Sequence, residues 1–386
     1  MLRGVAILLV LGRHDVMGPT DLGPLTSLAY AWRTIGWSGV DLFFVLSGYL
    51  VSGLFFSEYR KSGHINVSRF VIRRGFKIWP PYLAYLAVVG LWLTWRHHLS
   101  SPTRVWEDLW PNFLHVQNYF HTPRIHTWSL AVEEHFYLGL ALLFMVLIRT
   151  CGIAGFLRWL PVLIGGGVLA AATARHIAYL VEGPDRMNLY ATHLRFDGLL
   201  IGTLIAYWNH FHGEKMAALL RHPIGLIIIG AGLAAPTLIL SPEASPWLAS
   251  LGLVGVYIGF GLIMLGGLQL PKTHAWSEKL LTTRPAAWLG QVGFYSYSIY
   301  LWHVDLVQTP IRKTLQLITT PHLSAGAVWV IATIVYVVAA ILCGAALAHL
   351  VERPSLRIRD RLFPSLAQGV PIMVTQATAG SLTPAV

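Results

Sequence analysis

The sequence has 386 residues, of which 55% are hydrophobic and 12% are charged, and its formal net charge at pH 7 is +11. Soluble domains carry about 25% charged residues, so this composition excludes an ordinary soluble globular protein. The positive charge does not indicate nucleic-acid binding, because Lys and Arg lie mostly in short segments between apolar runs, as in membrane-protein loops. Cys151 and Cys343 are far apart in the sequence and predict neither a disulfide framework nor a metal site.

Apolar runs of about 18 residues or more recur along the chain, which is enough to cross a hydrocarbon core of about 30 Å. Because lipid leaves backbone polar groups without partners, these runs are expected to be helices. The sequence therefore predicts an all-α polytopic integral membrane protein with about ten transmembrane helices. We expect one transmembrane domain over 1–362 and a disordered cytoplasmic tail over 363–386. The predicted spans lie near 2–18, 36–56, 77–95, 127–148, 158–180, 193–211, 223–240, 248–269, 287–309 and 325–350.

The distribution of cations between the loops predicts the orientation. With the N-terminus inside, the cytoplasmic segments hold about twice as many Lys and Arg residues as the outward ones. The 57–77 segment contributes most, with six cations and one acidic residue, Glu58. This bias predicts an N-in, C-in protein of the cell inner (cytoplasmic) membrane.

The first predicted span carries Arg3 and His14. They are eleven residues apart, so they share one helix face at a separation of about 16 Å along the axis. Ionisable groups at membrane depth are costly and indicate functional sites. A guanidinium suits an anionic phosphate, and an imidazole suits proton transfer near neutral pH. The alternative is that each side chain only extends to its nearest headgroup layer.

The fourth predicted span opens with two adjacent carboxylates, Glu133 and Glu134. Helical spacing puts Glu133 on one polar face, and places Glu134 on another face as an interhelical partner for an Arg. A structural salt bridge is the alternative for either carboxylate. The polar face consists of His126, Ser129, Glu133 and Tyr137.

Polar residues in other spans extend this pattern. Asp41 is expected at the depth of His14, where it can orient the imidazole, and Ser47-Gly48 predicts close helix packing. In Arg195-Phe-Asp197 the two charges are expected to neutralise each other. His303, in the ninth span, is either a hydrogen-bonded packing residue or a catalytic one.

Six short motifs follow one another along the chain. They are Arg3 to His14, Gly39 to Gly48, Arg73 to Pro80, Trp128 to Tyr137, Ser296 to His303, and Glu352 to Pro354. In this order they resemble membrane acyltransferase family 3, which includes O-antigen and exopolysaccharide acetyltransferases and macrolide acyltransferases. The chain departs from the family pattern at the residues before Arg3, at Lys77 where Arg is common, and at Asp305 where Pro is common.

The resemblance implies an acyl-CoA-dependent O-acyltransferase, with acetyl-CoA as the expected donor and a carbohydrate or glycolipid hydroxyl as acceptor. His14 would be a general base or a transient acyl carrier, and both remain open. No metal, other cofactor or nucleic acid is expected. The rival is a proton-coupled secondary transporter, but the sequence shows no internal repeat. The implied catalytic residues are His14, Glu133, Asp41 and Glu134, the CoA-binding residues are Arg3, Arg73, Arg74 and Lys77, and the substrate-binding residues are His126, Trp128, Tyr137, Arg195 and His303.

Overall fold

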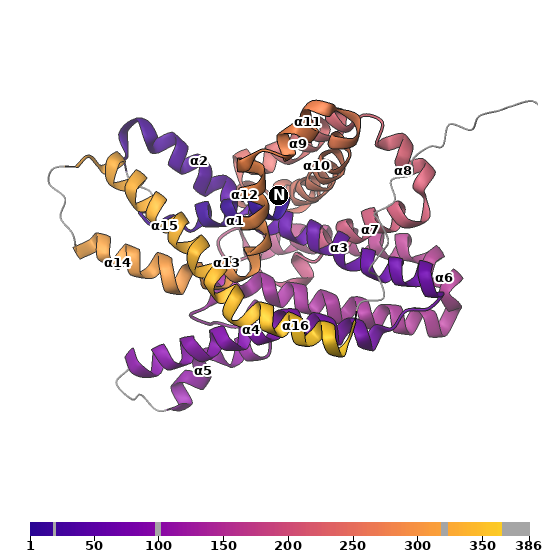
Figure 1. The fold of residues 1–386 in the computed structure, drawn as a ribbon, viewed down its shortest axis with the longest axis horizontal. Coiled ribbons are helices and arrows are strands. Elements are labelled where there is room, and N and C mark those ends of the chain that lie inside the picture. Colours follow the sequence, from indigo (N-terminus) through magenta and orange to yellow (C-terminus); the bar gives the residue numbers. More distant parts are fainter. Residues whose placement is uncertain (18–20, 97–101, 318–322, 365–386) are drawn as a thin grey trace, which may run out of the picture.

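The computed structural model describes residues 1–17, 21–96, 102–317 and 323–364, and these residues form helices without any strand (Figure 1). The tail predicted to be disordered lies almost wholly outside the described residues. The first third contains α1 (Leu2–Arg13), α2 (Thr26–Gly36), α3 (Ser38–Ser62), α4 (Val67–Arg96) and α5 (Pro102–Phe113). The middle contains α6 (Trp128–Glu182), α7 (Asp197–Phe211), α8 (Gly213–Leu219), α9 (Pro223–Leu240) and α10 (Leu253–Thr273).

The last third contains shorter helices and two π-helical turns. In Figure 1, α2, α5 and α14 gather toward the left of the molecule, whereas α8 lies at the right. The α-helices are α11 (Ala275–Leu281), α12 (Arg284–Phe294), α13 (Ser296–Trp302), α14 (Thr309–Leu317), α15 (Ala325–Leu347) and α16 (Arg353–Leu362). The π-helical turns are η6 (His303–Gln308) and η7 (Ala348–Glu352), and a third, η5 (Leu248–Gly252), precedes α10.

The predicted helical membrane class is confirmed, while the count of ten spans stays a prediction. In the part of the chain that the structure describes, six helical stretches are long and apolar enough to cross a membrane. Gly152, with φ of +67°, divides α6 into two arms, close to the two spans predicted there. The six stretches are Gly23–Ser62, Val67–Trp95, Ile125–Glu182, Pro223–Leu240, Leu248–Thr273 and Ala325–Leu362.

Two predicted spans differ in form. The helix expected over 2–18 ends at Arg13, because His14 leaves helical torsion angles. The helix expected over 287–309 is broken, since α12 ends at Phe294 and α13 gives way to η6 at His303. A π-helical turn inside a helix often marks a functional site.

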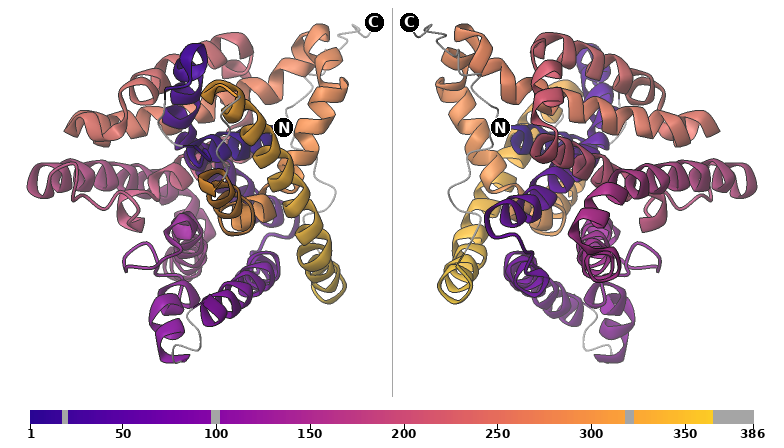
Figure 2. Two further views of the ribbon diagram at one scale, coloured as in Figure 1. Left: turned by 90° about the vertical axis from the view of Figure 1, so that its left-hand side faces the viewer. Right: turned by 90° about the vertical axis from the view of Figure 1, so that its right-hand side faces the viewer.

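The helix α1 lies inside the helix assembly, as the side views show (Figure 2). Its residues Ile7 and Leu11 are fully buried. Close contacts between backbones hold it there: a Cβ at Gly4 would lie 2.2 Å from a carbonyl oxygen of α12, and a Cβ at Gly39 of α3 would lie 2.4 Å from one of α1. Small residues at such contacts are typical of membrane helices.

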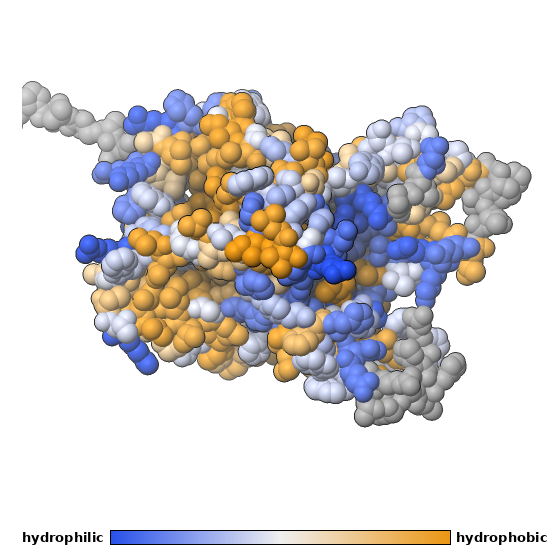
Figure 3. Space-filling view, turned by 180° about the vertical axis from the view of Figure 1, so that it is seen from behind, coloured by the Kyte–Doolittle hydropathy of each residue, from blue (hydrophilic) through white to orange (hydrophobic). Residues whose placement is uncertain are grey.

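Helix α3 packs equally closely on α7. A Cβ at Gly48 would lie 2.0 Å from the Leu199 carbonyl oxygen, and one at Gly202 would lie 2.2 Å from the Val45 carbonyl oxygen. The predicted small-residue packing at Gly48 is therefore confirmed. Elsewhere the surface exposes large apolar side chains such as Leu91 and Val181, and Figure 3 shows extensive hydrophobic areas on one face.

The expectation that Arg195 and Asp197 neutralise each other is wrong. Arg195 pairs with Asp41 of α3, and Asp197 pairs with Arg175 of α6 at 2.7 Å. Arg195 lies in the turn before α7, whereas Asp197 begins that helix, so their side chains meet different helices. Arg175 also donates to backbone carbonyls, including that of Ala249 at 2.7 Å, which satisfies a charge that would be costly to bury alone.

Candidate active site

His14 lies at the C-terminal end of α1, where the structure brings three imidazoles together. Its ring centroid is 5.0 Å from that of His303, in an edge-to-face arrangement, and the His126 ring lies 5.9 Å from His303 on another side. The His14 carbonyl accepts a hydrogen bond of 2.7 Å from Gln308 of η6, which ties the end of α1 to the π-helical turn. We call His14, His126 and His303 the histidine cluster.

His303 is held firmly inside this cluster. It is 1% exposed, and its Nδ1 lies 2.7 Å from the Tyr300 carbonyl oxygen. A carbonyl can only accept, so Nδ1 carries the proton and Nε2 is left as an acceptor. This Nε2 is buried without a hydrogen-bond partner, so its lone pair is available within the cluster.

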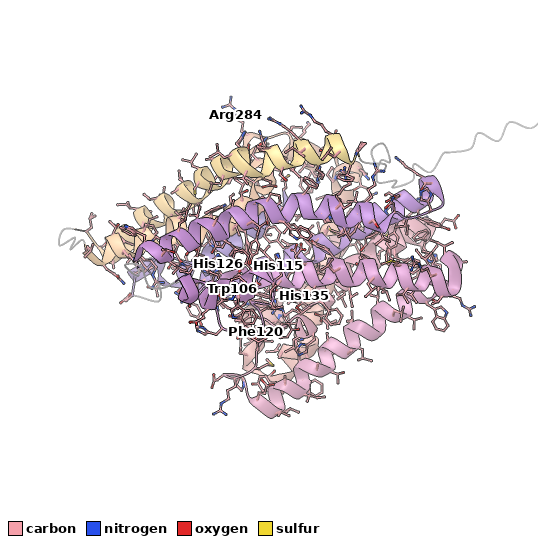
Figure 4. The ribbon with its side chains drawn as sticks, turned by 90° about the horizontal axis from the view of Figure 1, so that it is seen from below. Trp106, His115, Phe120, His126, His135 and Arg284 are labelled. Atoms are coloured by element: carbon pink, nitrogen blue, oxygen red, sulfur yellow. The ribbon has the colours of Figure 1, made fainter. Side chains whose placement is uncertain are left out.

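His126 is also buried, and Figure 4 shows it within the helix assembly, with Arg284 at the edge. The Tyr300 hydroxyl donates to the His126 carbonyl oxygen and shares a 2.6 Å hydrogen bond with Ser129. Tyr300 therefore joins α13 to the start of α6. The sequence placed His126 and Ser129 on one face but gave no signal that Tyr300 is their partner.

Neither carboxylate expected to orient His14 does so in this structure. Asp41 is fully buried and pairs with Arg195. Glu133 accepts a hydrogen bond of 2.7 Å from the Tyr137 hydroxyl and one of 3.4 Å from Ser47. Glu133 and Tyr137 thus share one face of α6, whereas His126 lies in the turn before this helix.

Glu133 belongs instead to a second group of charges, which we call the basic cluster: Arg3, Arg74, Lys77 and Glu133. Arg3 and Arg74 both act electrostatically on Glu133. Arg74 lies 5.5 Å from the centroid of the Tyr137 ring. Both guanidinium groups also act electrostatically on Lys77, together with the carboxylate of Glu352. The three cations of the cluster therefore exceed the carboxylates that act on them. Such an excess of positive charge inside a helix bundle is suited to an anionic ligand.

Glu134 and Arg73 have partners outside the basic cluster. Glu134 accepts a hydrogen bond of 3.1 Å from the Trp79 indole of α4. It forms no ion pair with an Arg among the described residues, although Arg74 acts on it electrostatically, so the predicted interhelical partner is met first by Trp79. Arg73 pairs with Asp360 of α16 at 3.1 Å and donates to the Phe363 carbonyl oxygen. Figure 1 shows α16 alongside α4, so this helix covers part of the predicted phosphate-binding motif.

Asp305, which stands where the family commonly has Pro, also interacts with neighbouring side chains. It pairs with Arg124 at 3.1 Å and accepts a hydrogen bond of 2.6 Å from the Tyr85 hydroxyl. The carboxylate thus links η6 to α4 and to the segment before α6, beside the histidine cluster.

A cavity of about 720 Å³ opens onto the histidine cluster, and His14 and His126 form part of its wall. Of the other predicted substrate-binding residues, Trp128 and Arg195 line this cavity, whereas Tyr137 lies in contact with the basic cluster. Sequence reasoning missed most of the remaining lining residues. They include Arg13, Tyr30, Arg33, Trp37, Asp185, Tyr190, Glu243 and Tyr300.

No group of three or more His, Cys, Asp or Glu residues among the described ones has the arrangement of a metal site. The three imidazoles are arranged edge to face around His303, which differs from ligands converging on one ion.

Comparison with known proteins places the chain in a family. It is 27% identical over 362 residues to the peptidoglycan O-acetyltransferase OatA of Listeria monocytogenes, covering 86% of this chain and 52% of that protein. It is 26% identical over 331 residues to YrhL of Bacillus subtilis, provisionally named a peptidoglycan O-acetyltransferase, covering 81% of this chain and 49% of that protein. The chain thus spans about half the length of these relatives. No solved structure matches it.

The family comparison covers most of the chain. Residues 1–349 match the family described as an acyltransferase domain, and this range includes the basic cluster, the histidine cluster and the cavity between the helices. The chain therefore belongs to this acyltransferase family, the membrane acyltransferase family 3 that its six motifs resemble.

Proposed function

We propose that this protein is a membrane O-acyltransferase that moves an acyl group, acetyl by preference, from cytosolic acyl-CoA to a hydroxyl group of an envelope glycan. OatA is named as a peptidoglycan O-acetyltransferase and YrhL provisionally so, which supports a glycan acceptor. Membership of the acyltransferase family favours this enzyme over a proton-coupled transporter.

One observation carries the proposal: the two clusters lie at opposite ends of α1. Arg3 begins the helix within the basic cluster, and His14 follows its last residue within the histidine cluster. Eleven residues of helix separate them by about 16 Å. A donor with an anionic head and a long flexible arm can bind at one cluster and present its thioester at the other.

The basic cluster supplies the donor site in this proposal. CoA carries several phosphate groups, and buried guanidinium and ammonium groups bind phosphate through charge-assisted hydrogen bonds. Arg3, Arg74 and Lys77 have the appropriate chemistry, and the two arginines already act electrostatically on the carboxylate of Glu133. Arg73 would join them on exchanging its Asp360 partner for a phosphate.

The histidine cluster supplies the proton transfer. His14 takes the proton of the acceptor hydroxyl as its oxygen attacks the thioester carbonyl carbon. The tetrahedral intermediate then collapses, the C–S bond breaks, and the CoA thiolate leaves and takes up the proton. If the imidazole itself attacks first, an acyl-His14 forms and the same hydroxyl attacks it in a second step. In both versions a neutral imidazole is needed, and the buried surroundings of His14 favour that form.

The proposal includes the topology of the chain. With ten spans and both ends inside, Arg3 faces the cytoplasm, where acyl-CoA is made, and His14 faces the outer half of the bilayer. The site would then join a cytoplasmic donor to an acceptor reaching it from the other side of the inner membrane.

The test is acyl transfer by the purified protein in lipid nanodiscs, with radiolabelled acetyl-CoA and unacetylated envelope glycan. The His14→Ala variant is expected to lose about 100- to 10,000-fold in rate, because it lacks the base. It should retain donor binding, since the basic cluster is intact, whereas Arg74→Ala should weaken acetyl-CoA binding. Wild-type protein that transfers no label to any glycan fraction would contradict the proposal.

A further inference from the structure

Two arginines in the wall of the cavity form no ion pair within the described residues. Arg13 ends α1 and Arg33 lies in α2, and both line the cavity beside His14. Neither guanidinium forms a hydrogen bond with a described residue, although both act electrostatically on His14. The cavity therefore has two cations without an ion-pair partner close to His14, the proposed base.

The neighbouring arginines show how unusual this is for the region. Arg124, Arg175 and Arg195 each pair with an aspartate, at 3.1 Å and 2.7 Å for the first two. Those three arginines are at most 9% exposed, and a charge buried to that extent is normally paired because an isolated charge is costly to desolvate. Arg13 is exposed and Arg33 is half-buried, so both guanidinium groups can be reached from the cavity and are free to bind an anionic group of a ligand.

Two carboxylates also form part of the cavity wall. Asp185, in the loop after α6, and Glu243, in the turn η4 (Pro242–Ala244), line the cavity but form no ion pair with either arginine. Glu243 accepts a hydrogen bond of 2.7 Å from Ser241. Carboxylates accept hydrogen bonds from hydroxyl groups, so this wall is suited to the neutral, hydroxyl-rich part of a ligand.

Aromatic side chains complete the cavity. Trp128 and Tyr190 lie with their ring centroids 5.0 Å apart in its wall, and Tyr30 and Trp37 line it from the α2 side. A sugar ring presents apolar C–H faces that can lie on aromatic rings, while its hydroxyls reach polar groups. The volume of about 720 Å³ is within the range of small-molecule sites.

We propose that the acceptor is a saccharide carrying an acidic substituent, which Arg13 and Arg33 bind. Its hydroxyls face Asp185 and Glu243, its ring lies on the aromatic residues, and one hydroxyl is placed beside His14. This assignment rests on the proposed acyl transfer, and it specifies in addition that the acceptor is negatively charged. The acidic group is a carboxylate or a phosphate, which share the same guanidinium chemistry.

The experiment changes the charge of the acceptor and of the protein together. Envelope glycan from cells lacking the protein is used in three forms: untreated, with its carboxylates amidated by carbodiimide, and with its phosphates removed by hydrofluoric acid. Each is offered with labelled acetyl-CoA to wild type, to Arg13→Gln/Arg33→Gln and to Arg186→Gln in nanodiscs. Arg186 is an exposed residue next to Asp185 that does not line the cavity, so it is the matched control.

Removing the correct anion is expected to raise the wild-type KM for glycan about 10- to 100-fold, with the KM for acetyl-CoA unchanged. The double variant should show the same rise on untreated glycan and no further loss on the neutralised form. The Arg186→Gln variant should behave as wild type. Loss on amidation identifies a carboxylate, and loss after hydrofluoric acid identifies a phosphate.

Two results would overturn the inference while leaving acyl transfer intact. One is an unchanged KM for both neutralised glycans in the wild-type protein. The other is a defect of the double variant that is equal on charged and neutralised glycan, since the arginines would then act on His14 or on lipid headgroups. Absence of transfer in every combination would instead contradict the proposed function itself.

Discussion

His14 lies beside other imidazoles in this structure. By analogy with a catalytic triad, a carboxylate is expected there. Asp41 forms an ion pair with Arg195. Glu133 accepts a hydrogen bond from Tyr137 and interacts electrostatically with the arginines of the basic cluster. His303 lies beside His14. Its Nδ1 donates a hydrogen bond to the Tyr300 carbonyl oxygen, and its Nε2 has no hydrogen-bond partner among the described residues. We therefore propose that His303 is a positioning residue, whose edge-to-face contact with the His14 ring favours one orientation of that ring.

This assignment predicts that His303→Ala lowers kcat about 10- to 100-fold, since small losses of orientation are costly to catalysis. The KM for acetyl-CoA should not change, because the basic cluster is distant. His303→Asn keeps a donor for the Tyr300 carbonyl and should recover part of the loss. The measurement is the pH profile of kcat for all three proteins. A profile of unchanged shape and height in His303→Ala would contradict a positioning role.

At the scale of single residues, the sequence predicted contacts along one helix better than contacts between helices. Helical spacing correctly placed Glu133 and Tyr137 on one face, since residues four apart are neighbours on any α-helix. It could not reveal that Arg195 selects Asp41 over Asp197, because that choice depends on how α3, α6 and α7 are packed.

At the scale of elements, close helix contacts depend on particular glycines. A Cβ at Gly48 would lie 2.0 Å from a carbonyl oxygen of α7, whereas one at Gly139 would meet nothing within 4 Å. Gly48→Ala is therefore expected to destabilise the protein by about 1–3 kcal/mol, as overpacking does. Gly139→Ala, the matched control in a helix, should leave stability unchanged or slightly raised.

Thermal unfolding of the two glycine variants in the same detergent measures this difference. We expect a clearly lower Tm for Gly48→Ala alone. Equal melting of both variants would mean that α3 and α7 can separate without cost, against the contact described here.

The last two motifs of the sequence, Ser296 to His303 and Glu352 to Pro354, are also in contact in the structure. Ser298 of α13 donates a hydrogen bond of 2.8 Å to Glu352 at the end of η7. A little further on, α16 brings Asp360 to Arg73. The sequence contains each motif but not their contact, because the motifs are about 50 residues apart and meet only when α15 packs against α13.

At the scale of the whole molecule, the orientation in the membrane decides which cluster meets the donor. Cys151 is exposed at the bend of α6, on a segment that the N-in topology places in the cytoplasm. In a Cys343→Ser background, a membrane-impermeant maleimide should label Cys151 only after the cells are permeabilised. His121→Cys is the control: this residue is exposed in the segment before α6, which the same topology places outside, so it should label in intact cells. Labelling of Cys151 in intact cells would reverse the proposed topology.

The sequence by itself determined the helical membrane class and the family, and it named the residues of the two clusters as site candidates without their grouping. These follow from local properties: apolar length, helical period and short motifs. Only the tertiary structure decided which charges pair, that His303 lies beside His14, and that Arg13 and Arg33 face a cavity without partners. The physical reason is that a buried charge or imidazole takes its partner from another helix, and helix packing rather than sequence spacing determines which helix that is.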